Sequence, residues 1–83
     1  MRLIIIGNLK YLFGCQLKKL RKARKLTQEN LAELTGLSVE FLSYIERGIH
    51  APSFDTLEKL SEALKVSFSE LFNFEEDESK TNE

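Results

Sequence analysis

Residues that could support covalent or metal chemistry are few in this 83-residue chain, and they are isolated from one another. Cysteine and histidine each occur once, as Cys15 and His50. This excludes an intrachain disulfide framework and a multi-histidine zinc site. The sequence also contains no nucleophile–base pair and no Gly-rich phosphate loop, so it predicts a protein that is not an enzyme and needs no cofactor. We expect Cys15 to be an ordinary thiol near the core.

The informative side chains lie instead on one segment, residues 39–47. At about 100° per residue, Phe41, Leu42 and Ile45 fall on one side of a helix, and this side must face the core. Short side chains on the outer side could meet base edges in a major groove, and an arginine could meet a phosphate. Any amphipathic helix has a polar outer face, so this pattern alone also fits a solvated helix. The outer side consists of Val39, Glu40, Ser43 and Arg47, flanked by Tyr44.

Hydroxyl residues mark where the helices that position this face begin. Thr27, Ser38, Ser53 and Ser67 each follow an apolar residue or proline, and each precedes a leucine by four positions. A Ser or Thr side chain at such a position accepts from an otherwise unpaired backbone N–H and starts a helix. An apolar stripe that begins at Phe13 predicts one earlier helix. The expected helices are therefore about 12–24, 28–35, 39–47, 54–64 and 68–73.

The connection between the second and third helices has the composition of a helix-turn-helix. Gly36 can adopt the left-handed conformation that lets the chain leave one helix and enter the next at a steep angle. Ala32 has a small side chain where the two helices would cross. These are the sequence features of that motif.

Three blocks in register resemble one family. They are FGCQLKKLRKARKLTQENLAELTG, LSVEFLSYIERG and APSFDTLEKLSEALKVSFSELF, which together span residues 13–72. This stretch resembles the Cro/phage-repressor-like helix-turn-helix family, also called the Xre type. The resemblance implies an all-α fold of five helices like that of lambda repressor, to which we add a short N-terminal arm or strand.

The resemblance also implies roles for individual residues. Gln28 matches a phosphate clamp at the start of the second helix, where the helix dipole favours an anion. Arg47 matches a phosphate contact, and Arg21 and Glu46 match an ion pair between the first and third helices. The positions that face bases or the adjacent backbone correspond to Val39, Glu40, Ser43 and Tyr44. The remaining phosphate candidates are Ser38, which is also the expected cap of its helix, and His50, which could equally be solvated.

Two positions depart from the family pattern. Lys25 stands where glycine is frequent, which costs little if the lysine accepts a left-handed turn. Glu40 stands where basic or amide residues are frequent. A carboxylate there repels phosphate but can accept from cytosine N4, which suggests a C·G preference at one position.

Charge is distributed unevenly along the chain. Residues 75–83 hold five of the thirteen acids and one of the twelve bases, so residues 1–74 carry eleven bases and eight acids, a net charge of +3. The predicted organisation is an N-terminal arm (1–11), a helix-turn-helix DNA-binding domain (12–74) and an acidic disordered tail (75–83). The longest apolar run, residues 3–6, is too short to span a membrane, and a cytoplasmic protein is expected.

One such reading helix covers few base pairs, so modules of this kind bind as two-fold dimers. The sequence predicts a homodimeric regulator, most simply a repressor, acting on double-stranded DNA at a near-palindromic operator. The alternative is an antitoxin or another interaction module whose main partner is a protein such as a toxin. Candidate dimer residues are Phe68, Phe72, Phe74, Ile4 and Ile6.

Overall fold

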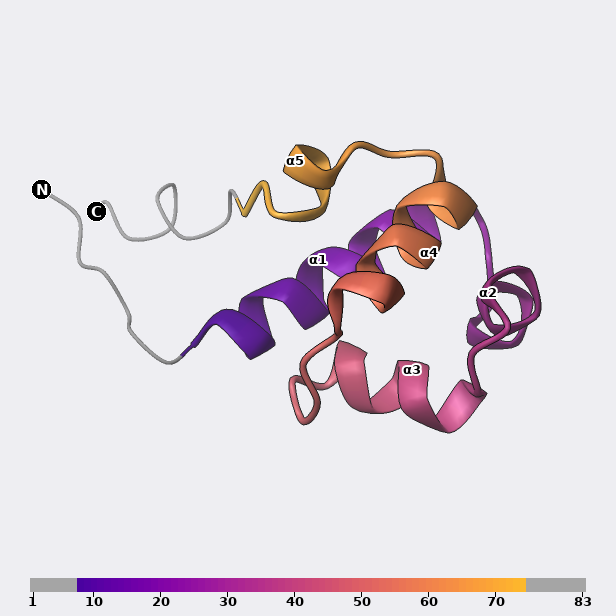
Figure 1. Ribbon diagram of the computed structural model, residues 1–83, viewed down its shortest axis with the longest axis horizontal. Helices are drawn as coiled ribbons and strands as arrows, with labels where there is room; N and C mark the ends of the chain where they lie inside the picture. The colour runs from indigo at the N-terminus through magenta and orange to yellow at the C-terminus, as the bar shows by residue number, and fades with distance from the viewer. Residues whose placement is uncertain (1–7, 75–83) are drawn as a thin grey trace, which may run out of the picture.

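A computed structural model of the chain describes residues 8–74, which form five helices and contain no strand (Figure 1). In Figure 1, α3 lies along the lower side of the molecule and α5 above α1. None of the helices in this described part is long and apolar enough to cross a membrane. The helices are α1 (Leu9–Ala23), α2 (Gln28–Thr35), α3 (Val39–Glu46), α4 (Phe54–Leu64) and α5 (Phe68–Leu71).

Hydroxyl caps set the starts of the last four helices, as the sequence predicted. Thr27, Ser38, Ser53 and Ser67 are the N-cap residues, and each side chain accepts from the backbone N–H three residues further on. At α2 the Asn30 side chain also accepts from the backbone N–H of Thr27, which completes a capping box. Each such cap contributes about 1 kcal/mol to stability.

The start of α1 differs from the prediction. The helix begins at Leu9 after Asn8, not at residue 12, so residues 9–11 are helical and do not belong to an extended arm. Residues 1–7 of the predicted arm lie outside the described residues. At their other ends, α1 and α3 each stop one residue earlier than predicted, and α5 stops two residues earlier.

The core is a single apolar cluster to which all five helices contribute. Helix α1 packs against α3 and α5, α2 packs against α3 and α4, and α4 packs against α5. Cys15 is exposed, so the expectation of a near-core thiol was wrong. The buried apolar residues are Phe13, Leu17, Leu20, Leu31, Ala32, Leu42, Ile45, Leu60, Leu64, Val66 and Leu71.

Two lysines end helices in a backbone conformation that usually favours glycine. Lys25, just after α1, has φ = 60°, and Lys65, just after α4, has φ = 58°. The left-handed turn that the sequence required of Lys25 is therefore present. For a residue with a Cβ atom, this left-handed conformation costs about 1–2 kcal/mol of stability relative to ordinary helical backbone.

Candidate nucleic-acid interface

The turn between α2 and α3 is held by a buried hydroxyl. Gly36 is left-handed, with φ = 78°, and its N–H donates to the carbonyl of Ala32. The hydroxyl of Thr35 donates to the carbonyl of Leu31 at 2.8 Å and accepts from the N–H of Leu37 at 3.2 Å. Thr35 therefore fixes the angle at which the chain enters α3, a role that the sequence analysis did not assign to it.

Helix α3 buries one side and presents most of the other. Leu42 and Ile45 are fully buried, whereas Glu40, Tyr44 and Arg47 are exposed and Ser43 is half-buried. The outer side predicted from helical phase is therefore the side that faces away from the core. Val39 is an exception in part, because its side chain is half-buried and packs against the core cluster.

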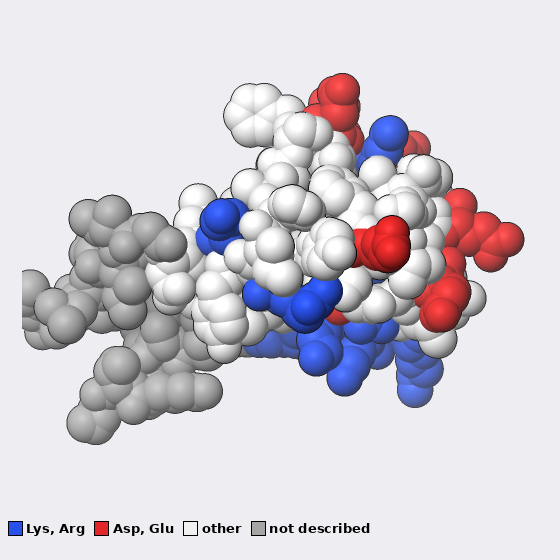
Figure 2. Space-filling model, turned by 90° about the horizontal axis from the view of Figure 1, so that it is seen from below, with Lys and Arg blue, Asp and Glu red and all other residues white. Residues whose placement is uncertain are grey.

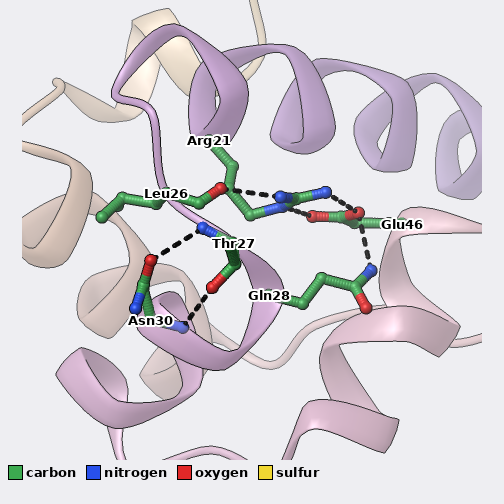
Figure 3. A network of polar contacts seen from close by, with 6 residues as sticks. All are labelled: Arg21, Leu26, Thr27, Gln28, Asn30 and Glu46. Carbon is green, nitrogen blue, oxygen red and sulfur yellow. Dashed lines mark hydrogen bonds and ion pairs between the residues drawn. The ribbon is translucent and has the colours of Figure 1, made fainter.

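A buried ion pair joins α1 to the end of α3 (Figure 3). The Nε of Arg21 donates to Oε2 of Glu46 at 2.6 Å, and its Nη2 donates to Oε1 at 3.0 Å. Its Nη1 donates to the carbonyl of Leu26 at 2.8 Å. The side chains of Arg21 and Glu46 are only 9% and 3% exposed, so removing one partner would leave a buried charge at a cost of about 3–5 kcal/mol. The predicted pair is formed.

Glu46 also engages Gln28, the proposed phosphate clamp. The Nε2 of Gln28 donates to Oε1 of Glu46 at 2.9 Å, and the amide lies between α2 and α3 in Figure 3. A carboxamide has two N–H donors, and this bond uses one of them. This contact could not be predicted from the sequence, because only the folded backbone brings the start of α2 to the end of α3.

The two ends of α3 hold the remaining phosphate candidates. At the N-terminal end, the Ser38 hydroxyl accepts from the N–H of Phe41 at 3.0 Å. At the other end, the guanidinium of Arg47 lies 5.1 Å from the ring centroid of Tyr44. The Tyr44 and His50 rings meet in a T-shaped contact, with a centroid distance of 5.1 Å. Arg47 and His50 thus both contact one aromatic ring.

Positive charge lies beside this face. Figure 2 looks at the molecule from the α3 side, and blue side chains gather along its lower edge while most red ones lie at the upper and right margins. Residues 10–25 contain no acid, and the Arg21 charge is neutralised by Glu46. The exposed bases of this stretch, on α1 or directly after it, are Lys10, Lys18, Lys19, Lys22, Arg24 and Lys25.

The dimer candidates have unequal exposure. Phe68 and Phe72 are 56% and 38% exposed, whereas Phe74 is half-buried and packs against the core cluster. The ring centroid of Phe72 lies 5.0 Å from that of Phe13 and 5.9 Å from that of Phe74. Ile4 and Ile6 lie outside the described residues. Within residues 8–74, no group of three or more His, Cys, Asp or Glu side chains could hold a metal ion.

The helix-turn-helix formed by α2 and α3 agrees with a comparison against known families. A family model described as helix-turn-helix matches residues 17–71. This chain belongs to the Xre-type helix-turn-helix family. Membership of the Xre-type family explains why the five helices, and the three sequence blocks that form them, follow one another in this order.

Relatives within the Xre-type family carry regulatory names. The immunity repressor protein of Bacillus phage phi105 is 46% identical over 56 residues, which cover 68% of this chain and 39% of that protein. The control protein C.MunI of a Mycoplasma species is 41% identical over 69 residues, which cover 82% of this chain and 93% of that protein. The chain thus spans about two fifths of the phage repressor but nearly the whole of the control protein.

A solved structure shows the same fold. The crystal structure of the restriction-modification controller protein C.AhdI from Aeromonas hydrophila matches with a TM-score of 0.74 and 40% sequence identity. The match covers 76% of this chain and 96% of that one.

Proposed function

We propose that this chain is a sequence-specific double-stranded DNA-binding transcriptional regulator that acts as a repressor. The outward face of α3 is the observation that carries the proposal. It presents short and polar side chains and is anchored to α1 by the buried Arg21–Glu46 pair. An α-helix with such a face fits a major groove, where these side chains reach base edges.

Within this interface, different residues on and around α3 contact the bases and the phosphates. Glu40 and Ser43 are the main base-reading residues, and the half-buried Val39 offers a smaller apolar contact. A carboxylate at position 40 suits a cytosine N4 donor. Phosphate contacts bracket this face and come from Gln28, Ser38, Arg47 and His50. The second N–H of Gln28 donates to phosphate while the first remains bonded to Glu46.

A homodimer on a near-palindromic operator completes the proposal. Two reading helices in a two-fold dimer lie about 34 Å apart, one turn of DNA. Phe68 and Phe72 support a self-contact, because they are large apolar side chains exposed beside α5. The similarity to the control protein C.MunI, of which the match covers 93%, supports a regulator of this kind.

The decisive experiment is a random-library DNA-binding selection followed by affinity measurements on the selected site. The selection should return a near-palindromic site. Arg47→Ala should weaken binding to all sequences by about 1.5–3 kcal/mol, because one charged phosphate contact is lost. It should also reduce the slope of log affinity against log salt by about one.

Lys59→Ala is the matched control, since it removes the same charge from an exposed position on α4. The Lys59→Ala variant should leave the slope of log affinity against log salt concentration nearly unchanged. Equal behaviour of the Arg47 and Lys59 variants would contradict the interface. If no sequence is enriched while a second protein co-purifies with the chain, the protein-interaction alternative replaces this proposal.

A further inference from the structure

Tyr44 occupies a position that, by resemblance to the family, faces either bases or the adjacent backbone, and its contacts link it to the phosphate side of the interface. Building on the proposed function, we propose that Tyr44 is a positioning residue that holds Arg47 for a phosphate and does not read a base. Because this contact organises an arginine that binds any sequence, Tyr44 sets affinity without setting specificity.

The contact between Arg47 and Tyr44 is a cation–π pair, in which the guanidinium lies over the ring. The carbon of the guanidinium lies 5.1 Å from the centroid of the tyrosine ring. An arginine near the end of a helix loses side-chain entropy when it binds a phosphate. Stacking on a ring restricts the guanidinium before binding and leaves its N–H edge available for a bidentate phosphate contact.

The ring of Tyr44 is itself fixed by the loop after α3. The carbonyl of Tyr44 accepts from the N–H of Ile49 at 2.8 Å and from that of His50 at 3.3 Å. These bonds fold residues 49–50 back over the helix end. The His50 ring then meets the Tyr44 ring at 86° and lies 6.0 Å from the Phe41 ring. The support for Arg47 therefore extends from Tyr44 through His50 to a side chain that packs on the core.

These contacts occupy part of the aromatic ring that a base would otherwise use. Tyr44 is 36% exposed, with Arg47 against its ring and His50 at a steep angle to it. Glu40 is fully on the exposed side of the same helix, and Ser43 is short enough to sit close to a groove floor. Base reading therefore belongs to Glu40 and Ser43.

Two variants separate positioning from base reading. Tyr44→Phe keeps the aromatic face and removes the hydroxyl, so the affinity should stay within about two-fold and the selected DNA sequence should be unchanged. Tyr44→Leu removes the aromatic face and should weaken binding about two- to ten-fold. This loss should be the same on selected and unrelated DNA. Ser43→Ala is the control for altered specificity, because it should change the selected sequence at one base step.

A double-variant cycle tests whether Tyr44 acts through Arg47. The double variant Tyr44→Leu/Arg47→Ala should bind no more weakly than Arg47→Ala alone. In the free protein, NMR signals of the Arg47 side chain should show a ring-current shift that persists in Tyr44→Phe and is lost in Tyr44→Leu. Thermal unfolding of each variant verifies that it is folded at the temperature of the assay.

The outcomes that overturn the inference differ from those that overturn DNA binding itself. A changed base preference in Tyr44→Phe or Tyr44→Leu, additive losses in the cycle, or an absent ring-current shift refutes the positioning role while DNA binding stands. A wild-type chain that enriches no DNA sequence, together with an Arg47→Ala variant that alters nothing, refutes both.

Discussion

Gly14 lies where α1 crosses the C-terminal end of α3. A Cβ atom built on Gly14 would lie 2.6 Å from the carbonyl oxygen of Glu46 and closer still to that of Ile45. Both neighbours are backbone atoms of a helix that is anchored by its own ion pair, so they cannot move aside cheaply. The missing side chain therefore allows α1 to approach closely enough for Arg21 to reach Glu46.

Gly14→Ala should destabilise the protein by about 1–3 kcal/mol, as overpacking usually does. Helix propensity alone predicts the opposite, a gain of about 1 kcal/mol, because alanine is the better helix former. The free energy of unfolding in urea distinguishes the two. Cys15→Ala, at the exposed neighbouring position, is the control and should change stability by less than about 0.5 kcal/mol.

Among individual residues, the resemblance to the family predicted the pairing of Arg21 with Glu46, and this pair is formed. Contacts that depend on side-chain direction were not predicted. The bond from Gln28 to Glu46 and the stacking of Arg47 on Tyr44 depend on how neighbouring elements meet, which no local pattern encodes. The role of Gly14 was hidden for the same reason, since in sequence it is only an interruption of a helix.

Among the elements, helix starts were predictable where a hydroxyl residue provides the cap. Thr27, Ser38, Ser53 and Ser67 fixed four starts to the residue. Asn8 makes no side-chain cap bond at the start of α1. The first turn also exposes Leu9 and Tyr11, so the buried stripe that signals a helix begins only further along. The start of α1 therefore had neither of the two signals that located the others.

Helix ends were less predictable than helix starts, because at two of them a lysine adopts a backbone conformation that would suit glycine better. Lys25→Gly should raise the free energy of unfolding by about 0.5–1 kcal/mol, since the relief of left-handed strain exceeds the extra chain entropy of glycine. Chemical denaturation measures the change. Lys22→Gly, inside α1, should instead lower stability by about 1 kcal/mol. A loss of stability in both variants would show that Lys25 makes a stabilising contact that outweighs its strain.

For the whole molecule, the uneven distribution of charge predicts how the chain responds to salt. Residues 75–78 are four consecutive acids, whereas positive side chains gather beside the proposed interface in Figure 2. Replacing these acids by their amides should strengthen DNA binding several-fold at 50 mM salt, because it removes long-range repulsion from phosphate. The gain should shrink at 200 mM, where the screening length is shorter. Gel-shift titrations at both salts measure it, and an equal gain at both would contradict an electrostatic origin.

Helix α3 is fastened at both ends. The hydroxyls of Ser38 and the buried Thr35 fix the first turn of α3. The ion pair between Arg21 and Glu46 fixes its last turn. A helix secured in this way is already in its working conformation before it meets a groove. For the proposed regulator, the pace of association is then set by collision and orientation, and no rearrangement of the reading helix has to follow the encounter.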